Sequence, residues 1–272
     1  MPIFTLVTTC KGRLEHLKQS LPRFLALEDC EVVVVDYDCP QQTADWVHAN
    51  HSQVTVIQAH DRPTFSAAKA RNLGAAAGSA PWLLFLDADI LADPALIPSA
   101  KSQLAPGRFL IPGPRTDETW GAIVVARADF NQVEGYDETF EGWGSEDIDL
   151  TDRLEAIGLG SATFSGALIQ ALPHDDALRT QFHGLRDRET SWTINGLYRT
   201  AKFDLRKQGV TLTAEGRALL YADVRRVLLS PRAEGAPTRL QLVFRTTGLP
   251  HVAFRASLTY EIAFGRPAAE GS

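Results

Sequence analysis

Short apolar segments alternate with longer amphipathic ones over the first ninety residues of this 272-residue chain. The run Val32-Val33-Val34-Val35 is apolar on both faces, which is typical of a central strand covered by helices on each side. The alternation predicts an α/β fold with a doubly wound, largely parallel sheet. The expected strands span residues 3–9, 31–36, 54–58 and 82–86, and the expected helices span 13–27, 41–50 and 65–77.

The pattern becomes less regular beyond residue 90, but it still predicts elements. Helices are expected at 94–104, 145–157, 186–208 and 215–229, and short strands at 109–111 and 120–126. Ser145 and Thr213 are expected as helix N-caps. After a linker near 233–237, residues 239–246 alternate as a strand does, whereas 252–264 fit strand or helix. We therefore expect a principal domain over 1–230 and a helical/β appendage of unknown role over 231–272.

The composition, 44% apolar and 22% charged, is that of a globular protein. A net charge of −6 argues against nonspecific nucleic-acid binding, because a phosphate backbone is held mainly by clustered Lys and Arg. Residues 231–272 carry a net charge of +2 and the rest carry −8. Peripheral membrane contact through the basic tail therefore stays open beside the commoner reading of a solvated face.

The three cysteines, Cys10, Cys30 and Cys39, form no Cys-x-x-Cys pair, which is typical of a reducing compartment. We expect them to be small buried side chains. No apolar run approaches the ~18 residues of a membrane span, and the N-terminus lacks the form of a signal peptide. A cytoplasmic protein without a transmembrane segment is expected.

Two carboxylates, Asp87 and Asp89, follow the apolar strand at 82–86 directly. Residues i and i+2 share a face of an extended chain, so both can point at one spot beyond the strand end. Ligands bind in this crevice of α/β sheets, and hard oxygen donors there suit Mg²⁺ or Mn²⁺ with a nucleotide's phosphates. Since Asp-x-Asp also occurs in ordinary turns, the pair needs support from the rest of the chain.

A second acidic segment runs from Gly142 to Asp147. Capping by Ser145 and the helix dipole would explain its carboxylates. Helix initiation does not explain Trp143 between two glycines, whereas an indole beside carboxylates suits a sugar. His174 follows another strand-like run, and an imidazole joining carboxylates would favour Mn²⁺, although a lone His is more often structural.

In this order the motifs resemble those of inverting GT-A glycosyltransferases of family 2. Phe85-Leu86-Asp87-Ala88-Asp89 is similar to the metal-binding DxD motif of that family, and the stretch from Thr9 to Leu17 looks like its opening strand and helix. Gly142-Trp143-Gly144-Ser145-Glu146-Asp147 resembles the C-terminal motif of β-1,4-galactosyltransferases and bacterial chondroitin-polymerase-like enzymes. The resemblance covers about residues 1–200. It implies a GT-A, Rossmann-like mixed sheet and transfer of a sugar from a UDP-sugar to an acceptor hydroxyl with inversion.

The resemblance also implies roles for single residues. Asp89 would coordinate Mn²⁺ (or Mg²⁺), with Asp87 supporting the metal or ribose and His174 as a further ligand. Asp147 would be the general base, while Glu146 and Trp143 shape the donor-sugar and acceptor pocket. The nucleotide would be lined by Thr8, Lys11, Arg13, Asp36, Phe65 and Asn72. Where the family often has an Arg after the Phe65 position, this chain has Ser66-Ala67-Ala68, so Lys69 or Arg71 would take over the phosphate contact.

Three other functions share parts of this pattern. A haloacid-dehalogenase-type phosphatase would have its Asp-x-Asp near the chain start, and a nucleotidyltransferase would have a Gly-rich loop after the first strand. A catalytically idle sugar-nucleotide or glycan-binding protein with the same fold is the third. The donor sugar, the oligomeric state and the acceptor stay open, and the acceptor could be a glycan, a peptide, a lipid-linked intermediate or a small molecule.

Overall fold

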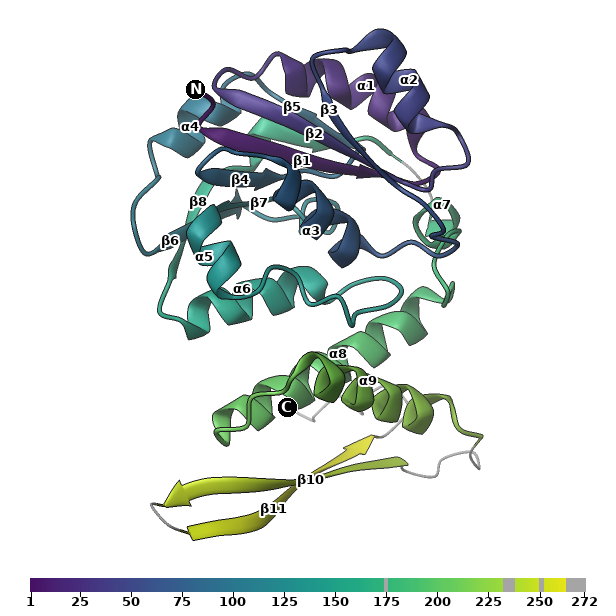
Figure 1. Cartoon of the computed structure of the whole chain (residues 1–272), viewed down its shortest axis with the longest axis vertical. Helices are drawn as coiled ribbons and strands as arrows, with labels where there is room; N and C mark the ends of the chain where they lie inside the picture. Colours follow the sequence, from purple (N-terminus) through teal and green to yellow (C-terminus); the bar gives the residue numbers. More distant parts are fainter. Residues whose placement is uncertain (174–175, 232–237, 250–251, 263–272) are drawn as a thin grey trace, which may run out of the picture. The chain divides into compact units, whose positions relative to one another are not determined.

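The computed structural model describes residues 1–173, 176–231, 238–249 and 252–262, which form two compact units, Met1–Arg188 and Glu189–Ser272 (Figure 1). A seven-stranded sheet with the order β3-β2-β1-β4-β7-β6-β8 lies at the centre of the first unit. Its strands are β1 (Phe4–Cys10), β2 (Cys30–Tyr37), β3 (Thr55–Ala59), β4 (Trp82–Phe85), β6 (Arg108–Gly113), β7 (Ile123–Ala126) and β8 (Gly160–Ser165). Only β7 runs antiparallel to its neighbours in this sheet, so the expected mixed, doubly wound α/β fold is confirmed.

Helices cover both faces of this sheet (Figure 1). One face carries α1 (Leu14–Leu25), α2 (Thr43–Asn50) and α4 (Leu96–Lys101), and the other carries α3 (Ala67–Ala77), α5 (Arg127–Gln132) and α6 (Glu146–Ala156). This layering explains why the central strands are apolar on both faces. In β1, Leu6 packs into the core on the α1 face and Val7 into the core on the α3 face. The valines of β2 divide in the same way.

Several short elements were not expected from the sequence. They are β5 (Ile90–Ala92), β8, α5, α7 (Asp176–Thr180) and a 3₁₀ turn (Gly166–Leu168), whereas β9 (Ile169–Ala171) lies within the strand-like run expected before His174. All of these unexpected elements span three to six residues, too few to show a hydrophobic period. The antiparallel pairing of β5 with β9 matters for the site, because it joins the chain after Asp89 to the chain before His174.

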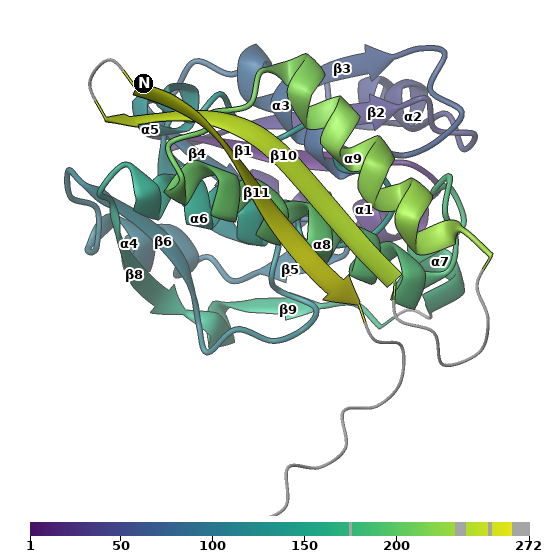
Figure 2. The same ribbon diagram turned by 90° about the horizontal axis from the view of Figure 1, so that it is seen from below.

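The second unit contains α8 (Arg188–Lys207), α9 (Ala214–Leu229) and an antiparallel hairpin of β10 (Thr238–Leu249) and β11 (Val252–Ile262), seen in Figure 2. The ambiguous segment at 252–264 is therefore a strand as far as residue 262. Thr213 caps α9 as expected, since its side chain accepts a hydrogen bond from the Gly216 N–H at 3.1 Å. The proposed boundary between residues 230 and 231 stays a prediction. Among the described helices, none has the length and apolar character needed to cross a membrane.

The N-cap expected at Ser145 is only half right. Ser145 does occupy the N-cap position of α6, but its backbone is left-handed, with φ of 74°, and its side chain makes no capping hydrogen bond. The hydroxyl is buried without a partner. In this conformation the side chain does not reach the N–H groups of the first turn, which a Ser in extended conformation usually does.

Candidate active site

The two aspartates that follow β4 are both ion-paired with arginines from other elements. Asp87 Oδ1 accepts a hydrogen bond from Arg71 Nη2 at 2.9 Å, and Asp89 Oδ2 accepts one from Arg13 Nη1 at 2.6 Å. Asp87 keeps 40% of its side chain exposed, whereas the Asp89 side chain is 11% exposed. Each carboxylate therefore faces a cation at the carboxyl edge of the sheet.

Arg71 of α3 connects the two acidic segments of the sequence. Besides Asp87, its guanidinium binds Asp147 Oδ1 at 2.8 Å and Glu146 Oε1 at 3.1 Å, both through Nη1. Its side chain is only 5% exposed, and its Cζ lies 5.2 Å from the centre of the Tyr136 ring. Carboxylates some sixty positions apart in the sequence thus share one buried cation. Below, Arg71 with Asp87, Glu146 and Asp147 is called the Arg71 cluster.

Burial and mutual repulsion perturb the titration of this cluster. Burial raises the pKa of Asp147, and Arg71 opposes that rise. Burial and the neighbouring Asp147 raise the pKa of Glu146 to about 7. Burial alone would lower the pKa of Arg71, but the facing carboxylates raise it above its ordinary value. Such perturbed groups gathered in one place are typical of functional sites.

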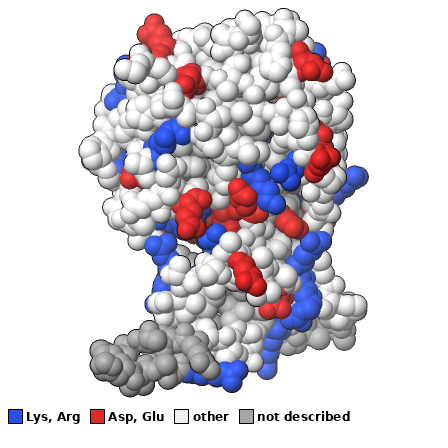
Figure 3. Space-filling view, viewed as in Figure 1, with Lys and Arg blue, Asp and Glu red and all other residues white. Residues whose placement is uncertain are grey.

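The loop before α6 brings an aromatic ring to this region. Gly142 and Gly144 have φ of 75° and 90°, conformations that glycine adopts without strain, and they flank Trp143. The Arg188 guanidinium carbon lies 4.0 Å from the centre of the Trp143 ring. Figure 3 shows acidic and basic side chains interspersed on the face in view.

The donor set suits a divalent cation. Asp87 and Asp89 offer hard oxygens, the ligands that Mg²⁺ and Mn²⁺ accept, at the edge where α/β sheets bind ligands. His174 lies outside the described residues, but the Leu172 N–H donates to the Asp89 carbonyl at 2.7 Å, so the chain approaches Asp89 two residues earlier. Within the described part of the chain, no group of three His, Cys, Asp or Glu side chains is arranged to hold a metal.

Two of the expected nucleotide residues hold the strand ends together, and a third is buried. Lys11 Nζ donates to the carbonyls of Tyr37, Asp38 and Arg62 at 3.1, 2.7 and 2.7 Å. Asp36 accepts the N–H groups of Cys39 and Ala44, both at 2.7 Å, and is 2% exposed. Thr8 is fully buried, with a hydroxyl that has no partner. Lys11 and Asp36 thus fix the loops after β1, β2 and β3, and a direct contact of these three residues with a nucleotide stays a prediction.

Asn72 and Phe65, the other two expected nucleotide residues near α3, contact different parts of the chain. Asn72 exchanges hydrogen bonds of 2.9 Å with the backbone of Tyr136, and its Nδ2 also donates to Glu138. The Phe65 ring meets His183 edge-on at 5.6 Å between ring centres.

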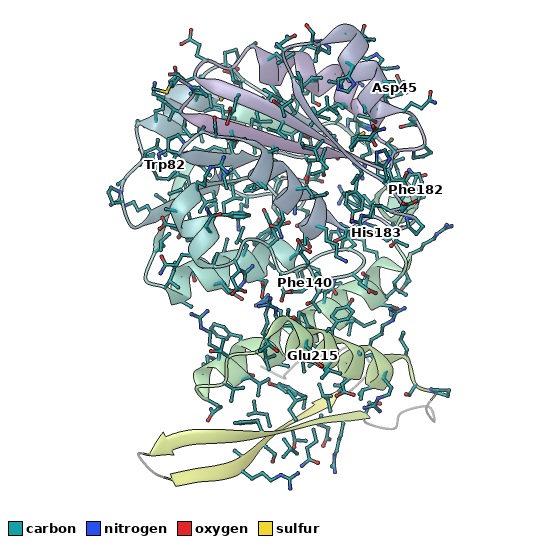
Figure 4. The ribbon with its side chains drawn as sticks, in the orientation of Figure 1. Asp45, Trp82, Phe140, Phe182, His183 and Glu215 are labelled. Atoms are coloured by element: carbon teal, nitrogen blue, oxygen red, sulfur yellow. The ribbon has the colours of Figure 1, made fainter. Side chains whose placement is uncertain are left out.

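Phe182 and His183, which no sequence pattern indicated, lie at the carboxyl ends of β1 and β2 (Figure 4). Phe182 approaches Gly12 so closely that a Cβ there would overlap its ring, and its carbonyl accepts the Phe65 N–H at 2.7 Å. His183 is 7% exposed, and burial with nearby Arg13 lowers its pKa to about 4. Neither residue belongs to a recognisable motif, so only the folded chain could reveal them.

The three cysteines are free. Cys10 and Cys39 are buried, as expected, and Cys30 is partly buried.

Two family models match the chain. One, described as glycosyl transferase family 2, matches residues 5–118, and another, described as the N-terminal domain of galactosyltransferase, matches residues 113–176. A validoxylamine A glucosyltransferase of Streptomyces hygroscopicus subsp. jinggangensis is 27% identical, over 58% of this chain and 53% of the relative. The enzyme of the same name from subsp. limoneus is 28% identical, over 49% and 43%. The chain thus spans about half the length of the curated relatives it matches.

Solved structures share the fold at low identity. The mannosyltransferase PcManGT of Pyrobaculum calidifontis, in complex with GDP-Man and Mn²⁺, matches with a TM-score of 0.58 at 14% identity, over 82% of this chain and 74% of that one. TarS residues 1–349 of S. aureus, in complex with UDP-GlcNAc, match with a TM-score of 0.58 at 13% identity, over 85% and 74%.

Proposed function

We propose that this chain, which belongs to the GT-A glycosyltransferases of family 2, transfers a sugar from a UDP-sugar to an acceptor hydroxyl with inversion of configuration. The observation that carries the proposal is the Arg71 cluster, in which one buried guanidinium binds Asp87 of the first acidic segment and Asp147 of the second. The reaction needs carboxylates that hold the metal for the leaving group and a carboxylate that activates the acceptor, all within one site. The two acidic segments meet at Arg71, as this requires.

Asp147 is the general base in this proposal. An acceptor hydroxyl must lose its proton as it attacks the anomeric carbon, and a carboxylate within hydrogen-bond reach contributes about 10²–10⁴ in rate. Burial makes Asp147 a stronger base than a solvated aspartate, while Arg71 opposes its protonation. Attack on the face opposite the leaving group inverts the anomeric centre, so an α-linked donor gives a β-linked product.

Asp87 and Asp89 would hold Mn²⁺ or Mg²⁺, with His174 as a proposed further ligand. When bound, such an ion stabilises the negative charge of a departing nucleotide diphosphate. Arg13, paired with Asp89 at 2.6 Å, supplies a protein cation at the same edge. The relative of known structure from P. calidifontis holds Mn²⁺ with its donor, which supports the choice of metal.

UDP is proposed as the nucleotide because TarS, of similar fold, binds UDP-GlcNAc. PcManGT binds GDP-Man, so a panel of donors must include both nucleotides. The curated relatives are named for validoxylamine A, so this molecule is proposed as one of the acceptors to test. A cytoplasmic location is proposed from the cysteine usage alone.

The proposal is tested with Asp147→Asn. We expect transfer from UDP-sugars in the presence of Mn²⁺ to fall at least 100-fold, because the base is lost while shape is kept. Glu155→Gln, an exposed carboxylate of the same helix, is the matched control and should retain activity. Near-normal transfer by Asp147→Asn, with intact folding and UDP binding, would remove Asp147 from the role of base.

An idle sugar-nucleotide-binding protein is the competing function. It is favoured by the two arginine pairs, since Arg71 and Arg13 already neutralise the carboxylates that a metal would need. Slow Mn²⁺-dependent hydrolysis of a UDP-sugar by the native protein, absent in Asp89→Ala, would identify an enzyme. Binding without any turnover would identify the binder.

A further inference from the structure

The segment between β6 and β7 touches the Arg71 cluster. A Cβ placed on Gly121 would lie 2.7 Å from Arg71 Nη2 and 2.9 Å from Asp87 Oδ2. Only a glycine leaves room for these two side chains, so the backbone at residue 121 packs directly on the ion pair. The neighbouring residue is Trp120, which the proposed function has not used.

A tight local turn presents Trp120. The Thr116 N–H donates to Thr119 Oγ1 at 3.0 Å, and the Thr119 N–H donates to the Thr116 carbonyl at 3.0 Å. The Ala122 N–H donates to the Thr119 carbonyl at 3.1 Å. Thr119 and Ala122 are buried at 6% and 2% exposure, whereas Trp120 between them is 40% exposed. The turn therefore buries its own polar groups and turns a large aromatic ring outward.

Arg115 links this ring to Asp147. Its guanidinium carbon lies 4.6 Å from the centre of the Trp120 ring, which places it over the indole. Burial lowers the pKa of Arg115, and the charge of Asp147 opposes that shift, so the guanidinium is within electrostatic reach of this carboxylate. Arg115 Nε is buried and has no hydrogen-bond partner. The indole thus lies beside a cation that is within electrostatic reach of the proposed base.

We propose that Trp120 is an acceptor-binding platform on which the ring of a sugar or similar cyclic polyol stacks, with Arg115 beside it to meet a hydroxyl. The inference rests on the proposed function, in which Asp147 is the base and must contact the acceptor. Groups around Asp147 therefore surround the acceptor rather than the nucleotide. An indole binds the C–H face of a sugar ring, which selects cyclic carbohydrates over a peptide or a lipid chain.

The kinetic test uses Trp120→Ala and Trp120→Phe with methyl glycosides and disaccharides of glucose, galactose and N-acetylglucosamine as acceptors, at saturating UDP-sugar. We expect the acceptor KM to rise at least tenfold in Trp120→Ala, with kcat changed less than threefold, and Trp120→Phe to recover most of the loss. Donor hydrolysis without acceptor should change less than twofold. Trp192→Ala, which removes a 44% exposed Trp of α8, is the matched control.

An unchanged acceptor KM in Trp120→Ala overturns the inference, as does an equal loss of donor hydrolysis, which would indicate a structural role. Calorimetric titration of the same saccharides, with UDP and Mn²⁺ present, tests the platform without turnover. Saccharide binding that is lost in Trp120→Ala supports the platform even if the native protein transfers no sugar, in which case only the proposed function fails. The inference is also overturned if the native protein neither binds any of these saccharides nor transfers a sugar to them.

Discussion

Among the side chains of the site, Arg71 decides how the carboxylates coexist. Glu146 and Asp147 are adjacent, largely buried and close to Asp87. Without Arg71, the repulsion between these carboxylates and the loss of their hydration would disfavour this arrangement. The sequence suggested Arg71 only as one of two possible phosphate contacts. Its three ion pairs connect α3, the end of β4 and the start of α6, and the phosphate contact stays a prediction.

Replacing Arg71 should therefore destabilise the fold strongly. We expect Arg71→Ala to lower the free energy of unfolding by about 3–5 kcal/mol, since it leaves buried carboxylates without a partner. Urea denaturation measures this, with Arg108→Ala, an exposed arginine at the start of β6, as the control expected within about 0.5 kcal/mol of the native protein. A loss below about 1 kcal/mol would show that the cluster is not held by this cation.

The raised pKa of Glu146 makes a prediction about pH. The folded protein keeps this proton to about pH 7, whereas the unfolded chain loses it near the ordinary value of 4.5, so its stabilising effect is lost as pH rises through this window. The lowered pKa of His183 acts in the opposite sense between about 4 and 6.5. A comparison of variants is therefore needed to isolate Glu146.

We expect the native protein to lose stability relative to Glu146→Gln between pH 5 and pH 7.5, by at most about 1.4 kcal/mol per pH unit. Urea denaturation of both proteins at four pH values gives this difference. A difference that does not change with pH would mean that Glu146 titrates normally in the folded protein.

At the scale of elements, the contact of α3 with the sheet positions Arg71, and a glycine makes this contact possible. A Cβ on Gly74 would lie 2.3 Å from Val7 Cγ1 and 3.0 Å from Val35 Cγ2, so the helix packs directly on β1 and β2. One turn of the helix separates Gly74 from Arg71. The sequence predicted this helix from its pattern, but not that it approaches the strands so closely.

Two Gly-to-Ala substitutions in helices should have opposite effects. Ala is favoured over Gly in a helix by about 1 kcal/mol, which we expect Gly196→Ala in α8 to gain, because a Cβ there meets nothing within 4 Å. In Gly74→Ala we expect overpacking of about 1–3 kcal/mol to outweigh that gain. Thermal unfolding of both variants checks the prediction, and a stabilised Gly74→Ala would contradict it.

At the scale of the whole molecule, the two units differ in charge. Residues 189–272 carry 12 basic and seven acidic side chains, whereas the chain as a whole has a net charge of −6. The first unit, which contains the Arg71 cluster, is therefore strongly acidic. An anionic UDP-sugar would be repelled by such a unit, and a divalent cation would reduce this repulsion.

Donor and metal should therefore stabilise the chain together. At 100 times the dissociation constant, a UDP-sugar with Mn²⁺ should add about 2.7 kcal/mol to the free energy of unfolding, seen as a higher Tm, and EDTA should abolish the shift. Asp89→Ala should show no shift with Mn²⁺ and UDP-sugar, whereas Asp93→Ala, in the loop after β5, should behave as the native protein. An equal shift with EDTA present would contradict the role of the metal.

The sequence by itself determined most strands and the longer helices of the first unit, because the apolar period of each is a local property that lies in consecutive residues. It also indicated both acidic segments, because each is contiguous and follows or begins a regular element. Short elements such as β5 and β8 could not be predicted, because each is paired with a strand far away in the chain.

Only the tertiary structure decided which charges meet. The pairing of Arg71 with Asp147, the burial that perturbs both, and the packing of Gly121 against Arg71 and Asp87 depend on distances between segments that no local pattern encodes. Packing brings these groups together, and burial in the interior then shifts their pKa values. The chemistry of the site therefore exists only in the folded chain.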